Sequence, residues 1–91
     1  MGEPIRSRVV VRGNVQGVFF RDTCRRKATE RGVAGWVTNR GDGAVEAVFE
    51  GERDAVSALV DWCGEGTRGA QVESVDETSE DPEGLSSFEV R

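Results

Sequence analysis

The chain has 91 residues, enough for one domain with a modest core and too few for two. Hydrophobic residues make up 36% of the sequence and charged residues 32%, which excludes a disordered, collagen-like or membrane composition. The longest apolar run is three residues, whereas a membrane-spanning helix needs about 20, and no secretory signal pattern is visible. We therefore predict a single domain over residues 1–91 that does not associate with a membrane.

Two residue types that often carry chemistry are missing. Histidine and tyrosine are absent, which excludes histidine general bases, histidine-based triads and most zinc sites. Cys24 and Cys63 stand far apart without a CxxC pattern, so we expect two buried thiols, and their pairing stays open. Two cysteines and no signal favour the reducing cytoplasm.

Charge is distributed unevenly along the chain, whose net charge is −5. Residues 1–40 carry nine basic and three acidic residues, whereas residues 41–91 carry three basic and fourteen acidic residues. A basic N-terminal half fits a small anionic ligand, and neutralisation of one half by the other fits equally well. The net negative charge argues against a nucleic-acid partner.

The first elements in chain order are a strand and a helix. Residues 5–12 alternate with period two, which predicts a half-buried strand. A loop bracketed by glycines follows. Residues 21–31 then predict a helix, because a buried-type residue recurs every four positions from Phe20.

A hairpin and a second helix come next. Residues 34–40 predict a strand, Asp42-Gly43 is a strong hairpin signal, and residues 44–50 predict the return strand. Residues 52–63 predict an amphipathic helix, because their apolar residues form one stripe.

The last third is weakly patterned. Val72 and Val75 mark a fourth strand, residues 76–84 predict a solvated loop because they carry five acidic residues, and residues 88–90 predict a last strand. The order is β-α-β-β-α-β, with a short extra strand if residues 88–90 pair separately. This order predicts a ferredoxin-like α+β sandwich, an antiparallel sheet with both helices on one face. That fold supports many functions and identifies none of them.

The loop from Gly13 to Arg21 has the features of an anion site. Its glycines at 13 and 17 permit positive φ, and successive N–H groups can converge on one point. The helix start adds unpaired donors, and the Arg21 guanidinium can grip two phosphate oxygens. Neither Gly-Lys-Ser/Thr nor GxGxxG is present, so a nucleotide is not indicated. Ordinary strand-to-helix loops share these features, so a purely structural role stays open.

Asn39, near the end of the second strand, is the other candidate. Asparagine is disfavoured in strands, and its carboxamide can hold a water molecule and a substrate oxygen at once. Alternatively, Asn39 simply begins the turn. We expect Gln16 to shape the loop, with ligand contact as the alternative, and Trp36 to serve packing. Phe19 fits the entrance of the site, and a core or rim role fits equally well.

Together the two stretches resemble the acylphosphatase signature. The matching segments are GNVQGVFFR at residues 13–21 and GWVTNRGDGAVE at residues 35–46, at the spacing of that family. The resemblance covers essentially the whole chain, although Arg31 stands where an apolar residue is common and the C-terminal third is only generically similar.

The resemblance implies hydrolysis of the carboxyl-phosphate bond of acyl phosphates to a carboxylate and inorganic phosphate, on the same fold and without a metal or cofactor. By position, Arg21 would bind the phosphoryl group and Asn39 would position the attacking water. The phosphate-binding loop would present the backbone N–H groups of Asn14, Val15, Gln16, Gly17, Val18 and Phe19. The partner would be a small-molecule acyl phosphate, and a monomer is the expected state.

Two other functions compete with hydrolysis. A binding module would hold phosphate or an acyl phosphate without turnover. An RNA-binding or regulatory domain of the same fold would want exposed aromatic residues and a basic face, which the acidic charge disfavours. The physiological acyl phosphate and the proton acceptor for the water stay open.

Overall fold

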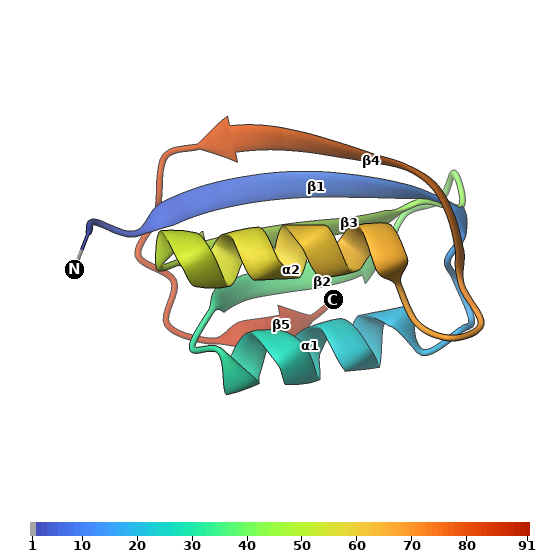
Figure 1. The fold of residues 1–91 in the computed structure, drawn as a ribbon, viewed down its shortest axis with the longest axis horizontal. Helices are drawn as coiled ribbons and strands as arrows, with labels where there is room; N and C mark the ends of the chain where they lie inside the picture. The colour runs from blue at the N-terminus through green and yellow to red at the C-terminus, as the bar shows by residue number, and fades with distance from the viewer. Residues whose placement is uncertain (1) are drawn as a thin grey trace.

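The computed structural model describes residues 2–91, so Met1 of the predicted domain over residues 1–91 lies outside the described residues. The elements are β1 (Ile5–Asn14), α1 (Phe20–Glu30), β2 (Ala34–Asn39), β3 (Val45–Gly51), α2 (Arg53–Glu65), β4 (Gln71–Glu80) and β5 (Phe88–Val90). The strands form one sheet in the order β4-β1-β3-β2-β5, and both helices cover the same face of it (Figure 1). The predicted ferredoxin-like sandwich is confirmed.

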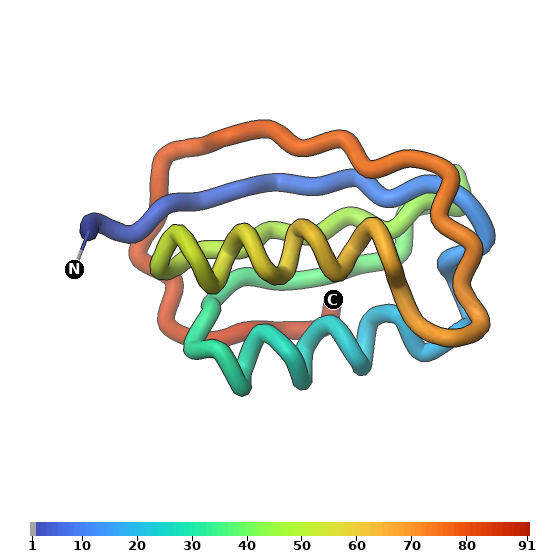
Figure 2. The backbone as a smooth tube through the Cα atoms, in the orientation of Figure 1, coloured from blue at the N-terminus to red at the C-terminus, as the bar shows by residue number. Residues whose placement is uncertain are grey.

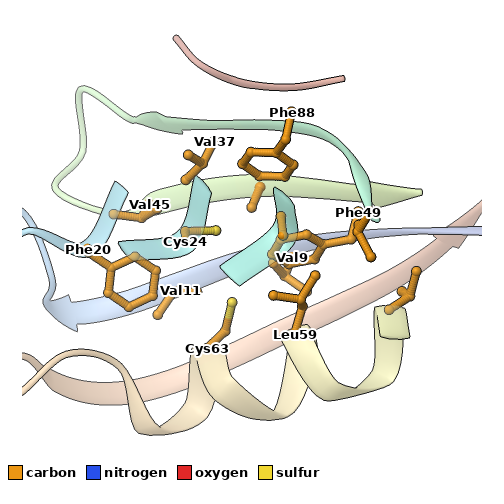
Figure 3. Packing of buried hydrophobic residues seen from close by; sticks show 14 of the residues in the cluster. Val9, Val11, Phe20, Cys24, Val37, Val45, Phe49, Leu59, Cys63 and Phe88 are labelled. Atoms are coloured by element: carbon orange, nitrogen blue, oxygen red, sulfur yellow. The ribbon is translucent and has the colours of Figure 1, made fainter. Parts of the chain in front are cut away.

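The core lies between the helices and the covered face of the sheet. Strand β1 alternates as predicted, because Val9 and Val11 are fully buried while Arg8 and Val10 are only half-buried. Figure 3 shows these valines facing buried side chains of both helices. The helices contribute Phe20, Cys24, Ala28, Val56, Leu59 and Cys63 to this core. Burial of each large apolar side chain contributes about 1.5–3 kcal/mol to folding.

The direction of the strands decides where the two sequence motifs meet. Strand β3 lies between β1 and β2 and is antiparallel to both, so β1 and β2 run in the same direction. Their carboxyl ends, Asn14 and Asn39, therefore lie at the same end of the sheet. Figure 2 shows α1 starting at this end of the molecule as well.

The sheet is mixed rather than purely antiparallel, which corrects the prediction on one point. Strand β5 pairs with β2 in parallel, with Gly35 opposite Phe88. Residues 81–87 carry the chain from β4 at one edge of the sheet to the opposite edge (Figure 1). The chain arrives there in the direction of β2, and this crossing produces the parallel pair.

The prediction of a solvated loop over residues 76–84 is wrong in its first part, because β4 continues to Glu80. Strand β4 pairs with β1 along its length. Glu80 accepts hydrogen bonds from Nε of Arg6 at 2.8 Å and from Nε of Arg8 at 2.7 Å. Glu77 accepts one from the Ser7 hydroxyl at 2.9 Å. Cross-strand charge pairs hold this exposed strand, and a hydrophobic period does not reveal them.

A buried carboxylate fixes the crossing loop. Glu50 of β3 is 5% exposed and lies 3.1 Å from Nη1 of Arg6. It also accepts backbone N–H bonds from Glu83, Gly84 and Leu85 at 3.2, 2.7 and 3.0 Å. Burial by itself raises the pKa of Glu50, but the three N–H bonds and Arg6 outweigh burial, and the pKa is lowered.

We predict that Glu50→Gln lowers the free energy of unfolding at pH 7 by roughly 2–3 kcal/mol, because hydrogen bonds to a charged group contribute about 1.5–3 kcal/mol each. The folded-state pKa lies below the ordinary value of 4.5, so this stability is present above that value and is lost as the pH falls through the folded-state pKa. Urea unfolding at pH 7 and pH 3 should show a smaller loss of stability in the variant than in the wild type. Glu89→Gln, which removes an exposed carboxylate, is the control. Equal pH dependence in Glu50→Gln and the wild type contradicts the prediction.

Candidate active site

The loop between β1 and α1 depends on two glycines. Gly13 lies at a bulge of β1 with φ 132°, and a Cβ there would stand 2.1 Å from the carbonyl oxygen of Gln71. Gly17 has φ 75° in open space. The first position therefore requires glycine for close backbone approach and the second for its conformation. The predicted positive φ is confirmed at both glycines.

Helix α1 begins without a side-chain cap. Its N-cap residue is Phe19, in the left-handed conformation with φ 59° and ψ 23°, and no side chain bonds the first turn. The Thr23 N–H is bonded to the Phe19 carbonyl oxygen at 3.1 Å. The N–H groups before it point out of the helix start, where the helix dipole adds partial positive charge. This end of α1 suits an anion.

A hollow of about 250 Å³ opens at the uncapped helix start. Its lining residues are Val15, Gly17, Phe19, Phe20, Arg21, Asp22 and Asn39. Arg21 belongs to α1 and Asn39 ends β2, so the structure brings the two predicted catalytic side chains together from separate elements. Both side chains are half-buried.

The other predicted loop residues lie beside the hollow and hold the loop in place. Nε2 of Gln16 donates hydrogen bonds to the carbonyl oxygens of Arg40 at 2.8 Å and Ala44 at 3.0 Å. These bonds tie the loop to the turn that follows Asn39, as expected for a loop-shaping residue.

The loop is tied on its other side too. The carbonyl oxygen of Val18 accepts a bond from the Thr67 hydroxyl at 2.7 Å, and Asn14 pairs with Gln71 at the end of β1. Sequence reasoning missed Thr67, because a threonine between α2 and β4 belongs to no motif or apolar period.

The turn between β2 and β3 fixes the position of Asn39. Asp42 accepts the Ala44 N–H at 3.1 Å and pairs with Arg40 at 3.2 Å and Arg12 at 3.4 Å. The Ala44 N–H bond, with help from both arginines, lowers the pKa of Asp42. Asn39 thus precedes the hairpin connection, as the turn interpretation expects, and it also lines the hollow. Its carboxamide makes no hydrogen bond to the described residues.

Ion pairs distinguish Arg6 and Arg8 of the basic N-terminal half from Arg21. Arg6 and Arg8 on β1 are neutralised by carboxylates of β3 and β4, as the mutual-neutralisation alternative expects. Within residues 2–91, no carboxylate lies within ion-pair distance of the Arg21 guanidinium, although Asp22 lines the same hollow. The hollow therefore carries positive charge from Arg21 and from the helix start.

Neither cysteine belongs to the site. Cys24 follows Arg21 by three residues in α1 but faces the core beside Cys63 (Figure 3), and both are free thiols. Burial raises the pKa of Cys63 to about 12. Burial and, secondarily, the nearby Cys63 raise the pKa of Cys24 further. A thiol that stays protonated is a poor nucleophile.

Two kinds of feature are missing from residues 2–91. Residues 2–91 contain no group of three or more histidine, cysteine, aspartate or glutamate side chains that could hold a metal ion. No helix in the same range has the length and apolar character that crossing a bilayer requires.

These features define the chain as an α+β sandwich with Arg21 and Asn39 beside an uncapped helix start. Its residues 7–90 match the family model for acylphosphatase. An acylphosphatase of Natronomonas pharaonis is 53% identical over 91 residues, which cover 100% of this chain and 99% of the relative. The chain belongs to the acylphosphatase family, and the predicted class of enzyme is confirmed.

Solved structures of the family have the same fold. The acylphosphatase from Coxiella burnetii superposes with a TM-score of 0.93 at 43% identity, covering 98% of this chain and 94% of that one. The acylphosphatase from Bacillus subtilis gives a TM-score of 0.92 at 35% identity, covering 96% of this chain and 98% of that one. The mixed five-stranded sheet described above is thus the fold of the family.

We predict that Gln16→Met lowers kcat for benzoyl phosphate by at least ~10-fold, because small displacements of catalytic groups are costly in rate. The variant keeps the length of the side chain and loses both bonds to the turn that positions Asn39. Steady-state kinetics measure kcat, and titration with inorganic phosphate measures anion affinity, which should change less. Gln71→Met removes an exposed glutamine and serves as the control. A wild-type kcat in Gln16→Met would contradict the role given to these bonds.

We predict that iodoacetamide at pH 8 labels neither thiol of the native protein, because both thiols are buried and keep their protons. Both should be labelled in concentrated urea. Mass spectrometry of the intact chain measures the extent of labelling. Rapid labelling of Cys24 in the native protein would show that the start of α1 opens more readily than its packing indicates.

Proposed function

We propose that this chain hydrolyses the carboxyl-phosphate bond of acyl phosphates in the hollow at the start of α1, without a metal ion. The observation that carries the proposal is the meeting of Arg21 and Asn39 beside an uncapped helix start. The products are a carboxylate and inorganic phosphate.

The phosphoryl group binds to the positively charged side of the hollow. The Arg21 guanidinium forks onto two phosphoryl oxygens, a geometry that suits arginine better than lysine. The backbone N–H groups of the loop from Asn14 to Phe19 and of the first turn of α1 supply the remaining donors. The two glycines and the Gln16 bonds hold this loop before substrate arrives, so little reorganisation is needed.

Asn39 positions the attacking water. Its carboxamide oxygen accepts a hydrogen bond from the water, and its NH₂ group donates to a phosphoryl oxygen. The water oxygen forms a bond to phosphorus while the bond from phosphorus to the acyl oxygen breaks. The carboxylate leaves with the electron pair of that bond, and the proton of the water passes to a phosphoryl oxygen.

Two polar side chains suffice because the leaving group is good. A carboxylate leaves without protonation, so no general acid is required at the acyl oxygen. Phosphoryl transfer depends mainly on positioning and on stabilising charge at the equatorial oxygens. Arg21 and the N–H donors supply that stabilisation in a site that the protein holds ready.

We also propose that the chain acts as a monomer in the cytoplasm. Its two free, buried thiols suit a reducing compartment. On the sheet face not covered by helices, the charges of Arg6 and Arg8 are paired with carboxylates of the same chain. Sedimentation of the purified chain tests the oligomeric state.

We predict that Arg21→Ala lowers kcat/KM for benzoyl phosphate by at least ~10²-fold in the presence of EDTA, because removing one preorganised donor costs about that much. It should also weaken binding of inorganic phosphate. Asn39→Ala should lower kcat and leave phosphate affinity nearly unchanged, because it places the water and not the anion. Release of benzoate followed by absorbance measures turnover, and calorimetry measures phosphate binding.

Two matched variants control for general damage. Arg53→Ala removes an exposed arginine at the start of α2, at the opposite end of the molecule (Figure 1). Thr78→Ala shortens an exposed polar side chain of β4. Both should retain wild-type kinetics. A folded wild type that binds phosphate without turnover would replace the hydrolase with a phosphate-binding module, and full turnover in Asn39→Ala would remove that residue from the mechanism.

A further inference from the structure

Phe19 stands apart from the other apolar residues of the chain. Its side chain is 78% exposed, the highest value among the large hydrophobic residues of the described chain. Its neighbours are accounted for by packing: Val18 packs against the core, and Phe20 is buried with its ring centroid 4.8 Å from that of Trp62. The core alternative for Phe19 is thereby excluded.

The backbone at Phe19 makes the choice of a large side chain costly. Phe19 is the only residue other than glycine with positive φ in residues 2–91, at φ 59° and ψ 23°. Glycine, asparagine and aspartate adopt this conformation most readily, and a bulky residue there is uncommon. An exposed phenylalanine thus gains nothing from the fold at this position. Unfavourable conformations of this kind cluster at functional sites.

The ring lies where the organic part of a substrate must pass. Phe19 lines the hollow together with Arg21 and Asn39. When the phosphoryl group is held by Arg21 at the helix start, the acyl group extends from the hollow toward its rim. Phe19 is the large exposed apolar side chain there, since Val15 is 1% exposed and Phe20 2%. The carboxylate of Asp22, which also lines the hollow, disfavours an acyl group that carries its own negative charge.

We propose that Phe19 determines acyl-group specificity by packing its ring against the substrate, and that the chain favours acyl phosphates with an uncharged aromatic or bulky apolar acyl group over acetyl or carbamoyl phosphate. This inference rests on the proposed hydrolysis at the hollow. The ring touches the leaving group and not the reacting phosphorus, so its loss weakens discrimination between substrates while the grip on phosphate persists.

The test compares kcat/KM for benzoyl phosphate and acetyl phosphate in the wild type, Phe19→Asn and Phe19→Tyr. Asparagine suits the left-handed backbone and removes the ring, whereas tyrosine keeps the ring. In Phe19→Asn, kcat/KM for benzoyl phosphate should fall about 5-fold to 10-fold, within the range of measured aromatic contacts, and that for acetyl phosphate should change less than about 2-fold. Phe19→Tyr should keep the wild-type ratio, and inhibition by inorganic phosphate should be unchanged in both variants.

A purely structural role for Phe19 gives a different result. Loss of a structural role would lower kcat/KM for both substrates equally and would change inhibition by inorganic phosphate. Either outcome overturns the proposal. An unchanged ratio of the two kcat/KM values in Phe19→Asn also overturns the proposal. As long as the wild type hydrolyses acyl phosphates, that result leaves the proposed hydrolysis intact.

A binding measurement separates this inference from the proposed hydrolysis. Benzoylphosphonate and acetylphosphonate carry the same two organic groups on a bond that is not hydrolysed. Tighter binding of benzoylphosphonate to the wild type, lost in Phe19→Asn, supports the ring contact even if neither acyl phosphate is turned over. Equal binding of both phosphonates to the wild type overturns it.

Discussion

The site depends on the parallel course of β1 and β2 on either side of β3. Neighbouring strands lie about 4.8 Å apart, so the ends of β1 and β2 are separated by about 10 Å. The Gln16 side chain reaches across this interval to the carbonyl oxygens of Arg40 and Ala44. The loop from Gly13 to Phe19 and the turn that follows Asn39 are thereby fixed relative to each other, and α1 starts at the same end of the molecule.

Sequence patterns predicted the parts of the fold in which burial has a regular period. The alternation in β1, the four-residue spacing in α1 and the Asp42-Gly43 turn all correspond to elements of the structure. The second half of β4 was not predicted, because polar contacts of Glu77 and ion pairs of Glu80 accompany its pairing with β1 in place of regular apolar burial. The parallel pairing of the three-residue β5 follows from the crossing loop, which leaves no local signal.

The sequence predicted part of the candidate site for a related reason. Arg21 and Asn39 belong to motifs with chemically distinctive residues, whereas their meeting in one hollow is a property of strand order. Thr67, which supports the loop through the Val18 carbonyl, could not be singled out, because one hydroxyl-to-carbonyl bond between distant segments imposes no pattern on the sequence. The exposure of Phe19 likewise became visible only in three dimensions.

Strand β4 also bears on how copies of the chain behave toward one another. It forms one edge of the sheet and presents unpaired backbone groups there, as any edge strand does. Four acidic residues lie along it, namely Glu73, Asp76, Glu77 and Glu80, and the opposite edge, β5, spans only three residues. Glu80 is neutralised by Arg6 and Arg8, but Glu73, Asp76 and Glu77 make no ion pair within residues 2–91, so two β4 edges repel each other. Strand β5 is too short to template a long ladder. Continuation of the sheet from one molecule to the next is disfavoured at both edges, and added salt weakens the protection at β4 because it screens charge beyond about 10 Å.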